Sequence, residues 1–421
     1  MTPMVSWLAL IFVAMLPMRY LDLPLNAQPG DLVFPFLAVA VRASTRPQRW
    51  ISAGDWPLAA YLAITLICSM VSPEPALGLA LFAKQIYGAA LFVVFRVVAK
   101  DAQLTPKLQR TLVVVTGLIT VASIAVIFHG TNEDAARSVF SQLQRMPFVG
   151  VVRRIRGLSA TPELFGNLLV VCAVHALALR VTASGHARVM WTLIVAILGV
   201  GEFVTYSHSA AGFAAAIALF VAGLTASRPL KAGTALAALA IVAMVNAASV
   251  VVPVRNGEPT HYEIERVSLD VAGHKMEGVL MSYAALKRVA WTSVVDHPLI
   301  GVGPGRFVAL SEAAVQEGRL TKSYRGSLPH CDIAGRSAET GLVGVVSLIL
   351  LWASWLRAGR RSWSTGSVSQ RAAVAVVFGL LVNSLNADVM NFRFLWLVLA
   401  WMWPQAGESA PASPLAERAR G

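Results

Sequence analysis

The sequence predicts an all-α, polytopic integral membrane protein with about twelve transmembrane helices and a large, partly helical periplasmic loop. The first observation is composition: 56% of the 421 residues are hydrophobic and only 14% are charged, with a mean hydropathy of +0.64. A soluble domain has about 25% charged residues. The second is a series of long apolar runs, and the third is a clustering of Lys and Arg in alternate loops.

The apolar runs approach the length that crosses a bilayer, about 20 residues. The second and last runs are short. The expected spans are Met4–Met18, Leu32–Val41, Pro57–Val71, Leu77–Val97, Leu112–Phe128, Leu164–Leu179, Val189–Tyr206, Ala210–Ala226, Thr234–Val251, Ala338–Leu356, Ala372–Leu385 and Phe392–Trp403. The first run lacks a basic segment before it and a small-residue cleavage site, so we interpret it as a retained helix and not a signal peptide.

The loop charges predict the orientation. With the N-terminus in the cytoplasm, every second loop is basic and the short loops between them carry almost no Lys or Arg, as the positive-inside rule requires. The basic loops contain Arg42, Arg46 and Arg49; Lys100, Lys107 and Arg110; Arg180 and Arg188; Arg228 and Lys231; and Arg357, Arg360, Arg361 and Arg371. Both termini are therefore expected in the cytoplasm. This bias explains many of the basic residues behind the formal net charge of +13, so we expect no nucleic-acid partner.

This topology divides the chain into four parts. Residues 1–251 carry helices one to nine and a basic outer loop at 129–160. Residues 252–337 form a periplasmic cap loop that carries the expected active site, residues 338–404 carry helices ten to twelve, and residues 405–421 form a cytoplasmic tail. Because long loops between spans are usually functional or disordered, and the cap loop has a helical pattern after Met281, we expect it to pack over the membrane domain.

Both outer loops are rich in arginine, against the positive-inside expectation. The first contains Arg137, Arg145, Arg153, Arg154 and Arg156, and the second contains Arg255, Arg266, Arg288, Arg306, Arg319, Arg325 and Arg336 with Lys275, Lys287 and Lys322. The planar guanidinium binds phosphate through two parallel hydrogen bonds. The clusters indicate a phosphate-bearing ligand at the outer leaflet, or alternatively a solvated basic surface that faces anionic lipid headgroups.

The most informative motifs follow the cap loop into the membrane. Arg-Val-Ala-Trp begins at Arg288 and is followed by His-Pro-Leu-Ile-Gly-Val-Gly-Pro-Gly-Arg-Phe at 297–307. His330 comes next, and Ala-Glu-Thr-Gly-Leu-Val-Gly at 338–344 opens the tenth expected span. The proline and three glycines predict a tight turn whose backbone can approach another group closely. This turn would fix Arg288 relative to the loop that carries His330.

This order of motifs resembles the O-antigen ligase and polymerase family, whose members show Arg and Trp on a helix, a "PLxGxGxGxF" turn, a His, and "ETGLxG" leading into a membrane helix. Two upstream segments are also similar: Arg-Gly-Leu-Ser-Ala-Thr-Pro at 156–162 with Gly-Asn at 166–167, and Thr-Tyr-Ser-His-Ser-Ala at 205–210. The resemblance covers residues 156–403. The sequence differs from the family pattern at Cys331, His208 and Glu163, where Asn or Ser, Arg and Asn are usual.

The resemblance implies a glycosyltransferase that uses a glycan on undecaprenyl diphosphate in the outer leaflet as donor. The acceptor would be the lipid A–core oligosaccharide for a ligase. His330 would be the general base, because imidazole can take a proton near neutral pH. Arg156, Arg288 and Arg154 would bind the diphosphate, whose developing charge arginine can neutralise without a metal. No cofactor and no metal site are expected, since the sequence has no DxD motif and its three cysteines form no CxxC pair.

Four further residues are secondary candidates: His208, Glu339, Lys84 and Arg306. His208 can alternatively cap a helix at the outer surface, and Glu339 can be a carboxylate favoured by the helix dipole. Lys84 lies within an apolar run, where charged residues are usually functional, or it pairs with Glu202, which lies in another span.

The expected location is the inner membrane of a Gram-negative bacterium, with the site facing the periplasm and membrane lipids around it. Two alternatives within the class are an O-antigen polymerase and a protein O-oligosaccharyltransferase, which would share these motifs. A different class is a transporter of an anionic or lipid-linked substrate. The sequence has no internal repeat and no paired broken helices of the kind that transporters use.

The topology predicts which positions a membrane-impermeant thiol reagent reaches. In single-cysteine variants, positions Lys322 and Gly257 should be labelled from the periplasm because both lie in the cap loop, whereas position Arg361 should be protected in intact cells. Labelling is read on a gel before and after permeabilisation. Periplasmic labelling at position 361 would contradict the orientation and place the expected site on the wrong side.

Overall fold

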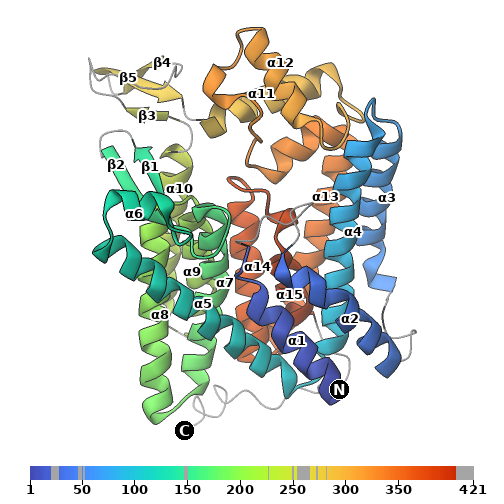
Figure 1. The fold of residues 1–421 in the computed structure, drawn as a ribbon, viewed down its shortest axis with the longest axis vertical. Helices are drawn as coiled ribbons and strands as arrows, with labels where there is room; N and C mark the ends of the chain where they lie inside the picture. Colours follow the sequence, from blue (N-terminus) through green and yellow to red (C-terminus); the bar gives the residue numbers. More distant parts are fainter. Residues whose placement is uncertain are drawn as a thin grey trace.

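The computed structural model describes residues 1–19, 28–45, 50, 53–146, 150–225, 227–248, 251–253, 266–271, 274–280 and 282–403. The expected tail at 405–421 lies outside these residues. The protein is a helical bundle with a cap over one end, and the N-terminus lies at the opposite end (Figure 1). This arrangement confirms a helical, membrane-embedded protein.

Six helices are long and apolar enough to cross a membrane: α4 (Pro75–Val98), α5 (Leu104–His129), α7 (Pro162–Thr182), α8 (Gly185–Thr205), α10 (Arg228–Ala248) and α13 (Asp332–Thr365). Six shorter helices complete the bundle: α1 (Pro3–Met15), α2 (Pro29–Ser44), α3 (Trp56–Met70), α9 (Ser209–Leu224), α14 (Val368–Asn383) and α15 (Arg393–Met402). Each of the twelve expected segments overlaps one of these helices. How many of the shorter helices cross the bilayer remains a prediction.

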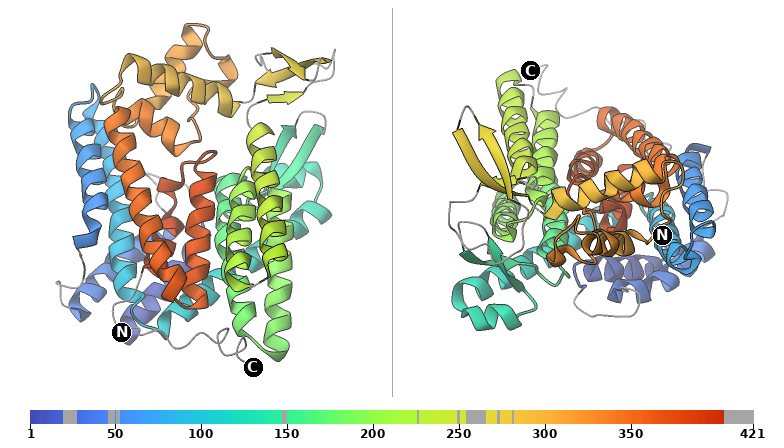
Figure 2. Two further views of the ribbon diagram at one scale, coloured as in Figure 1. Left: turned by 180° about the vertical axis from the view of Figure 1, so that it is seen from behind. Right: turned by 90° about the horizontal axis from the view of Figure 1, so that it is seen from above.

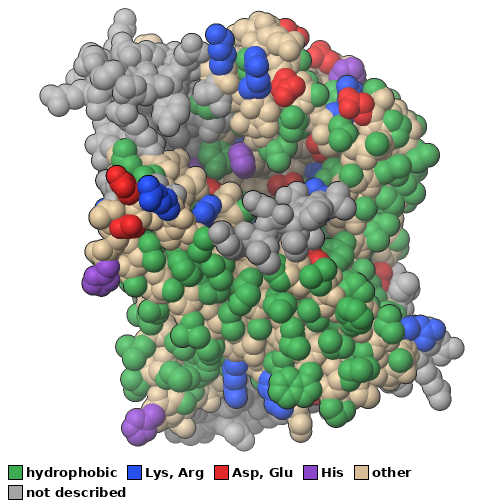
Figure 3. Space-filling model, viewed as in Figure 1, with side chains coloured by type: hydrophobic (Ala, Val, Ile, Leu, Met, Phe, Trp, Pro, Cys, Tyr) green, Lys and Arg blue, Asp and Glu red, His purple; other side chains and the backbone are tan. Residues whose placement is uncertain are grey.

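Helix α7 is the centre of the bundle. It packs against α5, α8, α9 and α14, and nearly all of its residues from Leu164 to Leu179 are buried. A helix that is apolar on every side is expected in such a central position. The outer helices instead expose large apolar side chains such as Leu118, Phe203 and Leu236, and apolar side chains cover the flank of the bundle (Figure 3). This apolar surface is suited to lipid.

The cap is only partly helical. It contains α11 (Ser282–Asp296), α12 (Phe307–Gln316) and the short 3₁₀ helix η4 (Lys322–Tyr324), which lie over the end of the bundle (Figure 2). Its own small core includes Leu286, Val289 and Phe307. Two other 3₁₀ helices, η3 (Ala53–Asp55) and η5 (Val389–Asn391), precede α3 and α15.

The structure also contains two small antiparallel sheets, which the expected all-α class did not include. In the first outer loop, α6 (Asn132–Arg137) leads into a hairpin of β1 (Ser141–Met146) and β2 (Gly150–Ile155), with Ser141 opposite Ile155. In the cap, β3 (Val251–Pro253), β5 (His274–Leu280) and β4 (Arg266–Val271) pair in that order, with Val251 opposite Leu280 and Arg266 opposite Val279. Both sheets lie in segments too polar for a membrane span, so a pattern of long apolar runs does not predict them.

The Gly/Pro turn at 297–305 is joined to a kink in α13. The kink is at Gly341, whose φ of 62° is a left-handed value that favours glycine. Leu342 donates its N–H to the Pro298 carbonyl at 2.8 Å, and Val302 and Gly303 donate to the carbonyls of Ala338 and Glu339 at 2.9 and 3.0 Å. The turn and the start of the helix therefore exchange backbone hydrogen bonds, which fixes the cap on α13.

Replacing Gly301 with alanine should disrupt this junction. Gly301 has a φ of +66°, so an alanine there would add backbone strain of about 1–2 kcal/mol. Its Cβ would also lie 2.5 Å from the Ala338 carbonyl oxygen, and such overpacking costs a further ~1–3 kcal/mol. The thermal midpoint of the purified protein should fall. The control is Gly318→Ala, where φ is +72° but nothing lies within 4 Å; an equal loss in both variants would show that the close contact has no effect.

Candidate functional site

The candidate site lies in a hollow between the cap and the bundle, where a histidine side chain is visible (Figure 3). Three aromatic rings from separate segments meet there. The ring centroid of Tyr283, on α11, lies 4.5 Å from that of His208 and 5.0 Å from that of His330. His208 precedes α9 and His330 precedes α13. The fold therefore brings the predicted base and one secondary candidate to the same tyrosine, which we call the His–Tyr–His group.

The backbone of His330 is unusual. Its φ is 47°, a left-handed conformation that is uncommon for residues other than glycine and tends to persist where the surrounding structure enforces it, often at functional sites. The residue is exposed, while Pro329 and Cys331 on either side are buried. The two buried neighbours anchor the backbone that presents this single side chain.

The surroundings of the two histidines favour the neutral imidazole. Burial lowers the pKa of His208 to about 4, although the nearby carboxylate of Glu163 opposes part of this shift. Desolvation by the surrounding protein also lowers the pKa of His330, and the charge of Lys287 lowers it further. The carboxylates of Glu163 and Asp388 oppose part of this shift. Burial and Glu163 raise the pKa of the Tyr283 hydroxyl. At neutral pH both imidazoles can therefore accept a proton while the tyrosine remains a hydrogen-bond donor.

The three predicted diphosphate-binding arginines occupy different environments. Arg154, only 3% exposed, forms a 2.6 Å ion pair with Glu163 in the first turn of α7 and donates to the Thr205 carbonyl and the Gln144 side chain. Arg156 is half-buried and donates to the backbone carbonyls of Val139 and Ser138 at 3.1 and 3.3 Å. Arg288 is exposed on α11. The structure therefore holds Arg154 beside the His–Tyr–His group through Glu163.

Two secondary candidates stabilise the Gly/Pro turn. The Glu339 carboxylate accepts the backbone N–H groups of Gly305 and Phe307 at 3.1 and 3.4 Å and lies 3.7 Å from Arg336. Arg306 forms a 3.0 Å ion pair with Glu74, which precedes α4. Both side chains thus connect the turn to the bundle.

Lys84 and Glu202, which the sequence suggested as partners, lie apart from each other. Lys84 is exposed on α4. Glu202 is buried in α8 and accepts a 2.5 Å hydrogen bond from Ser209. The hydroxyl of Ser209 also contacts that of Ser207, so Glu202 anchors the turn that carries His208.

The sequence motifs did not point to Tyr283 and Asn386, and the sequence included Lys287 only as one member of the basic cap-loop cluster. Tyr283 and Lys287 are four residues apart on α11 and therefore share a helix face, and the Lys287 ammonium donates to the Asn386 side chain at 3.4 Å. The helical pattern after Met281 draws attention to Arg288 instead. The i, i+4 spacing of a tyrosine and a lysine is the signal in the sequence that indicates the shared face.

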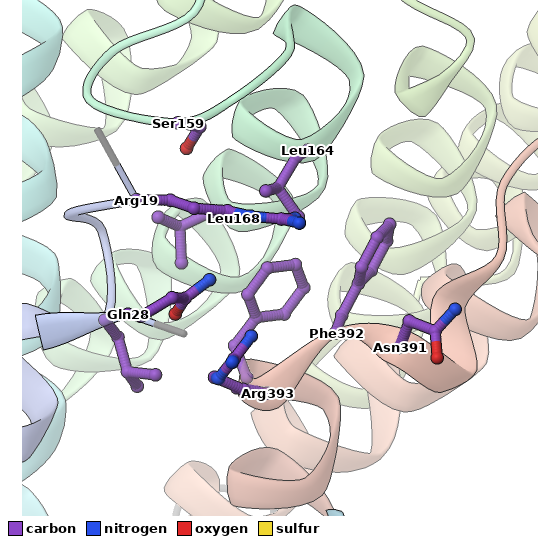
Figure 4. Close-up of a pocket in the computed structure, with 10 residues that line it drawn as sticks. Arg19, Gln28, Ser159, Leu164, Leu168, Asn391, Phe392 and Arg393 are labelled. Atoms are coloured by element: carbon purple, nitrogen blue, oxygen red, sulfur yellow. The ribbon is translucent and has the colours of Figure 1, made fainter. Parts of the chain in front are cut away.

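A second, small cavity lies among the ends of α1, α2, α7 and α15 (Figure 4). Its polar lining includes Arg19, Gln28, Ser159 and Arg393. The Arg393 guanidinium binds the Asp31 carboxylate through two nitrogens, so its charge is already neutralised. The cavity therefore presents less net charge than its composition suggests.

No family model matches the chain, and no curated protein matches it. What the fold and the site define is a class: a membrane-embedded helical protein with two histidines and a tyrosine beneath a cap. Among the residues that the structure describes, no three His, Cys, Asp or Glu side chains are grouped so that they could hold a metal ion.

Proposed function

We propose that the protein is a glycosyltransferase of the O-antigen ligase type. It moves an O-antigen glycan from undecaprenyl diphosphate to the lipid A–core oligosaccharide, in the inner membrane of a Gram-negative bacterium. In this proposal twelve helices span the membrane, both termini are cytoplasmic and the cap is periplasmic. The observation that carries the proposal is the position of His330: an exposed, neutral imidazole in a left-handed turn, against Tyr283 and beneath the cap.

The reaction is a single displacement. His330 takes the proton of the acceptor hydroxyl while that oxygen forms a bond to the anomeric carbon of the donor sugar. The bond between this carbon and the diphosphate oxygen breaks, and the undecaprenyl diphosphate leaves with the electron pair. The anomeric configuration is inverted, because the hydroxyl attacks from the face opposite the leaving group. Neither a metal nor a cofactor takes part.

The proposed role of Arg156, Arg288 and Arg154 is to neutralise the diphosphate. Arg154 is already paired with Glu163, so it offers the diphosphate less positive charge than an unpaired arginine would. Arg288 lies on the same helix as Tyr283 and reaches the headgroup from the outer side of the cap. His208 completes the aromatic floor of the site through its contact with Tyr283.

His330→Ala should lower transfer by about 10²–10⁴-fold, the usual contribution of a general base, with donor binding largely retained. His330→Gln should be nearly as inactive, because an amide cannot take up a proton. Since desolvation lowers the pKa of His330, the wild-type rate should stay constant through neutral pH and decline only as the pH falls below about 6.5. The assay uses purified protein with a lipid-linked donor and a lipid A–core acceptor.

The control for His330 is His297→Ala, because His297 lies exposed on the cap at the start of the Gly/Pro turn and has no proposed role in proton transfer. Its rate should stay near that of the wild type. Wild-type turnover in the His330 variants, or a product that keeps the donor's anomeric configuration, would contradict the assigned role.

Deletion of the gene should separate the ligase from its alternatives. If the protein is a ligase, lipopolysaccharide should lose all O-antigen while long lipid-linked polymer accumulates, because polymerisation precedes transfer to the core. A band carrying a single repeat unit would indicate a polymerase instead. Unchanged lipopolysaccharide with loss of a glycoprotein would indicate a protein O-oligosaccharyltransferase. The banding pattern on a gel and the extracted lipid-linked pool are the two measurements.

A further inference from the structure

Lys287 lies on the face of α11 that carries Tyr283, and it is half-buried. Its ammonium lies 3.4 Å from the side-chain oxygen of Asn386. Burial lowers the pKa of Lys287, and the interaction with Cys331 opposes this. Lys287 also influences the pKa of both His208 and His330. Lys287 also lies one helical turn from Tyr283, the residue whose ring lies beside both histidines.

Among the residues that the structure describes, no carboxylate balances the charge of Lys287. Three arginines of the outer end have acidic partners: Arg154 pairs with Glu163 at 2.6 Å, Arg306 with Glu74 at 3.0 Å, and Arg336 lies 3.7 Å from both Glu339 and Asp388. Within the described part of the chain, Lys287 has no carboxylate at ion-pair distance, and its hydrogen-bond partner is a neutral amide. An unbalanced, half-buried cation favours the binding of an anion.

A chain of amides holds Lys287 in place. Asn386, only 2% exposed, donates its amide N–H to the side-chain oxygen of Asn246 at 3.0 Å. Asn246 lies on α10, Asn386 follows α14 and Lys287 lies on α11. Three separate segments thus position one ammonium group, and a positioned charge stabilises a developing negative charge without reorganisation. A lysine that served only to increase solubility would not require this support.

We propose that Lys287 binds the phosphate groups of the donor lipid and stabilises them as the diphosphate departs. The proposal rests on the proposed function, and it adds a residue that the motifs did not indicate. The ammonium and the imidazole of His330 then act from opposite ends of the reacting group: one balances the leaving diphosphate and the other takes the acceptor proton. Asn386 and Asn246 are positioning residues for Lys287.

The experiment measures binding separately from transfer. The full-length protein in lipid nanodiscs is titrated with undecaprenyl diphosphate that carries no glycan, and binding is followed by thermal stabilisation. Lys287→Gln should weaken binding by about 10–100-fold, the range for loss of a hydrogen bond to a charged group. Lys287→Arg should stay within a few fold of the wild type. The donor KM should rise in parallel in Lys287→Gln, and the pH at which the rate declines should move upward, because the charge of Lys287 lowers the pKa of His330.

The matched control is Lys322→Gln, because Lys322 is also a cap lysine but is exposed on η4. This substitution removes the same charge, and the variant should bind the diphosphate lipid as tightly as the wild type does. Asn386→Ala should reproduce part of the Lys287→Gln defect. The thermal midpoint of each unliganded variant shows whether the protein is folded.

The outcomes separate the two proposals. Wild-type affinity in a folded Lys287→Gln protein would overturn the role of Lys287 and leave the His330 reaction intact. An equal defect in Lys322→Gln would also overturn it, because the effect would then be one of overall charge. If the wild-type protein itself does not bind the diphosphate lipid, both this proposal and the proposed donor are wrong.

Discussion

The arrangement of the whole outer end depends on the backbone hydrogen bonds between the Gly/Pro turn and the kink of α13. A helix that enters a bilayer must satisfy its backbone polar groups within the protein, and a kink frees several of them. Here Pro298 and Leu299 offer their carbonyls to the N–H groups of Leu342 and Val343, while the turn donates in return to Ala338 and Glu339. Glycine is needed on both sides, because Gly301 and Gly341 have left-handed φ values and leave no room for a Cβ.

This junction also determines where the chemistry can occur. It anchors the cap on α13, and α11 with Tyr283 precedes the turn directly. The loop with His330 leads into the same helix from the other side. Glu339 strengthens the arrangement from within the helix by accepting the N–H groups of Gly305 and Phe307. The acidic residue thus has a structural reason for its place in the motif, independent of any contact with a substrate.

The helices could be predicted from the sequence because apolar runs of membrane length are typical of bilayer-spanning segments and rare elsewhere. The hairpin at 141–155 and the cap sheet could not be predicted this way, since neither has an apolar run and both lie in polar loops. The positions of the glycines indicated a tight turn but not its partner, because the hydrogen bonds join segments about forty residues apart in sequence. The same limit applies to the site. The motif indicates His330, whereas the contact of Tyr283 with two histidines and the unbalanced charge of Lys287 depend on packing between distant segments.

The kink in α13 has a mechanical consequence for the cap. It separates a short outer segment, from Asp332 to Thr340, from a longer one over residues 342–365. The Gly/Pro turn is hydrogen-bonded to both segments: Leu342 and Val343 on the longer one donate to its carbonyls, and Ala338 and Glu339 on the shorter one accept from its N–H groups. The angle between the two segments therefore cannot change unless these hydrogen bonds break. Because His330 lies just before the shorter segment, its direction of approach is fixed by the same bonds.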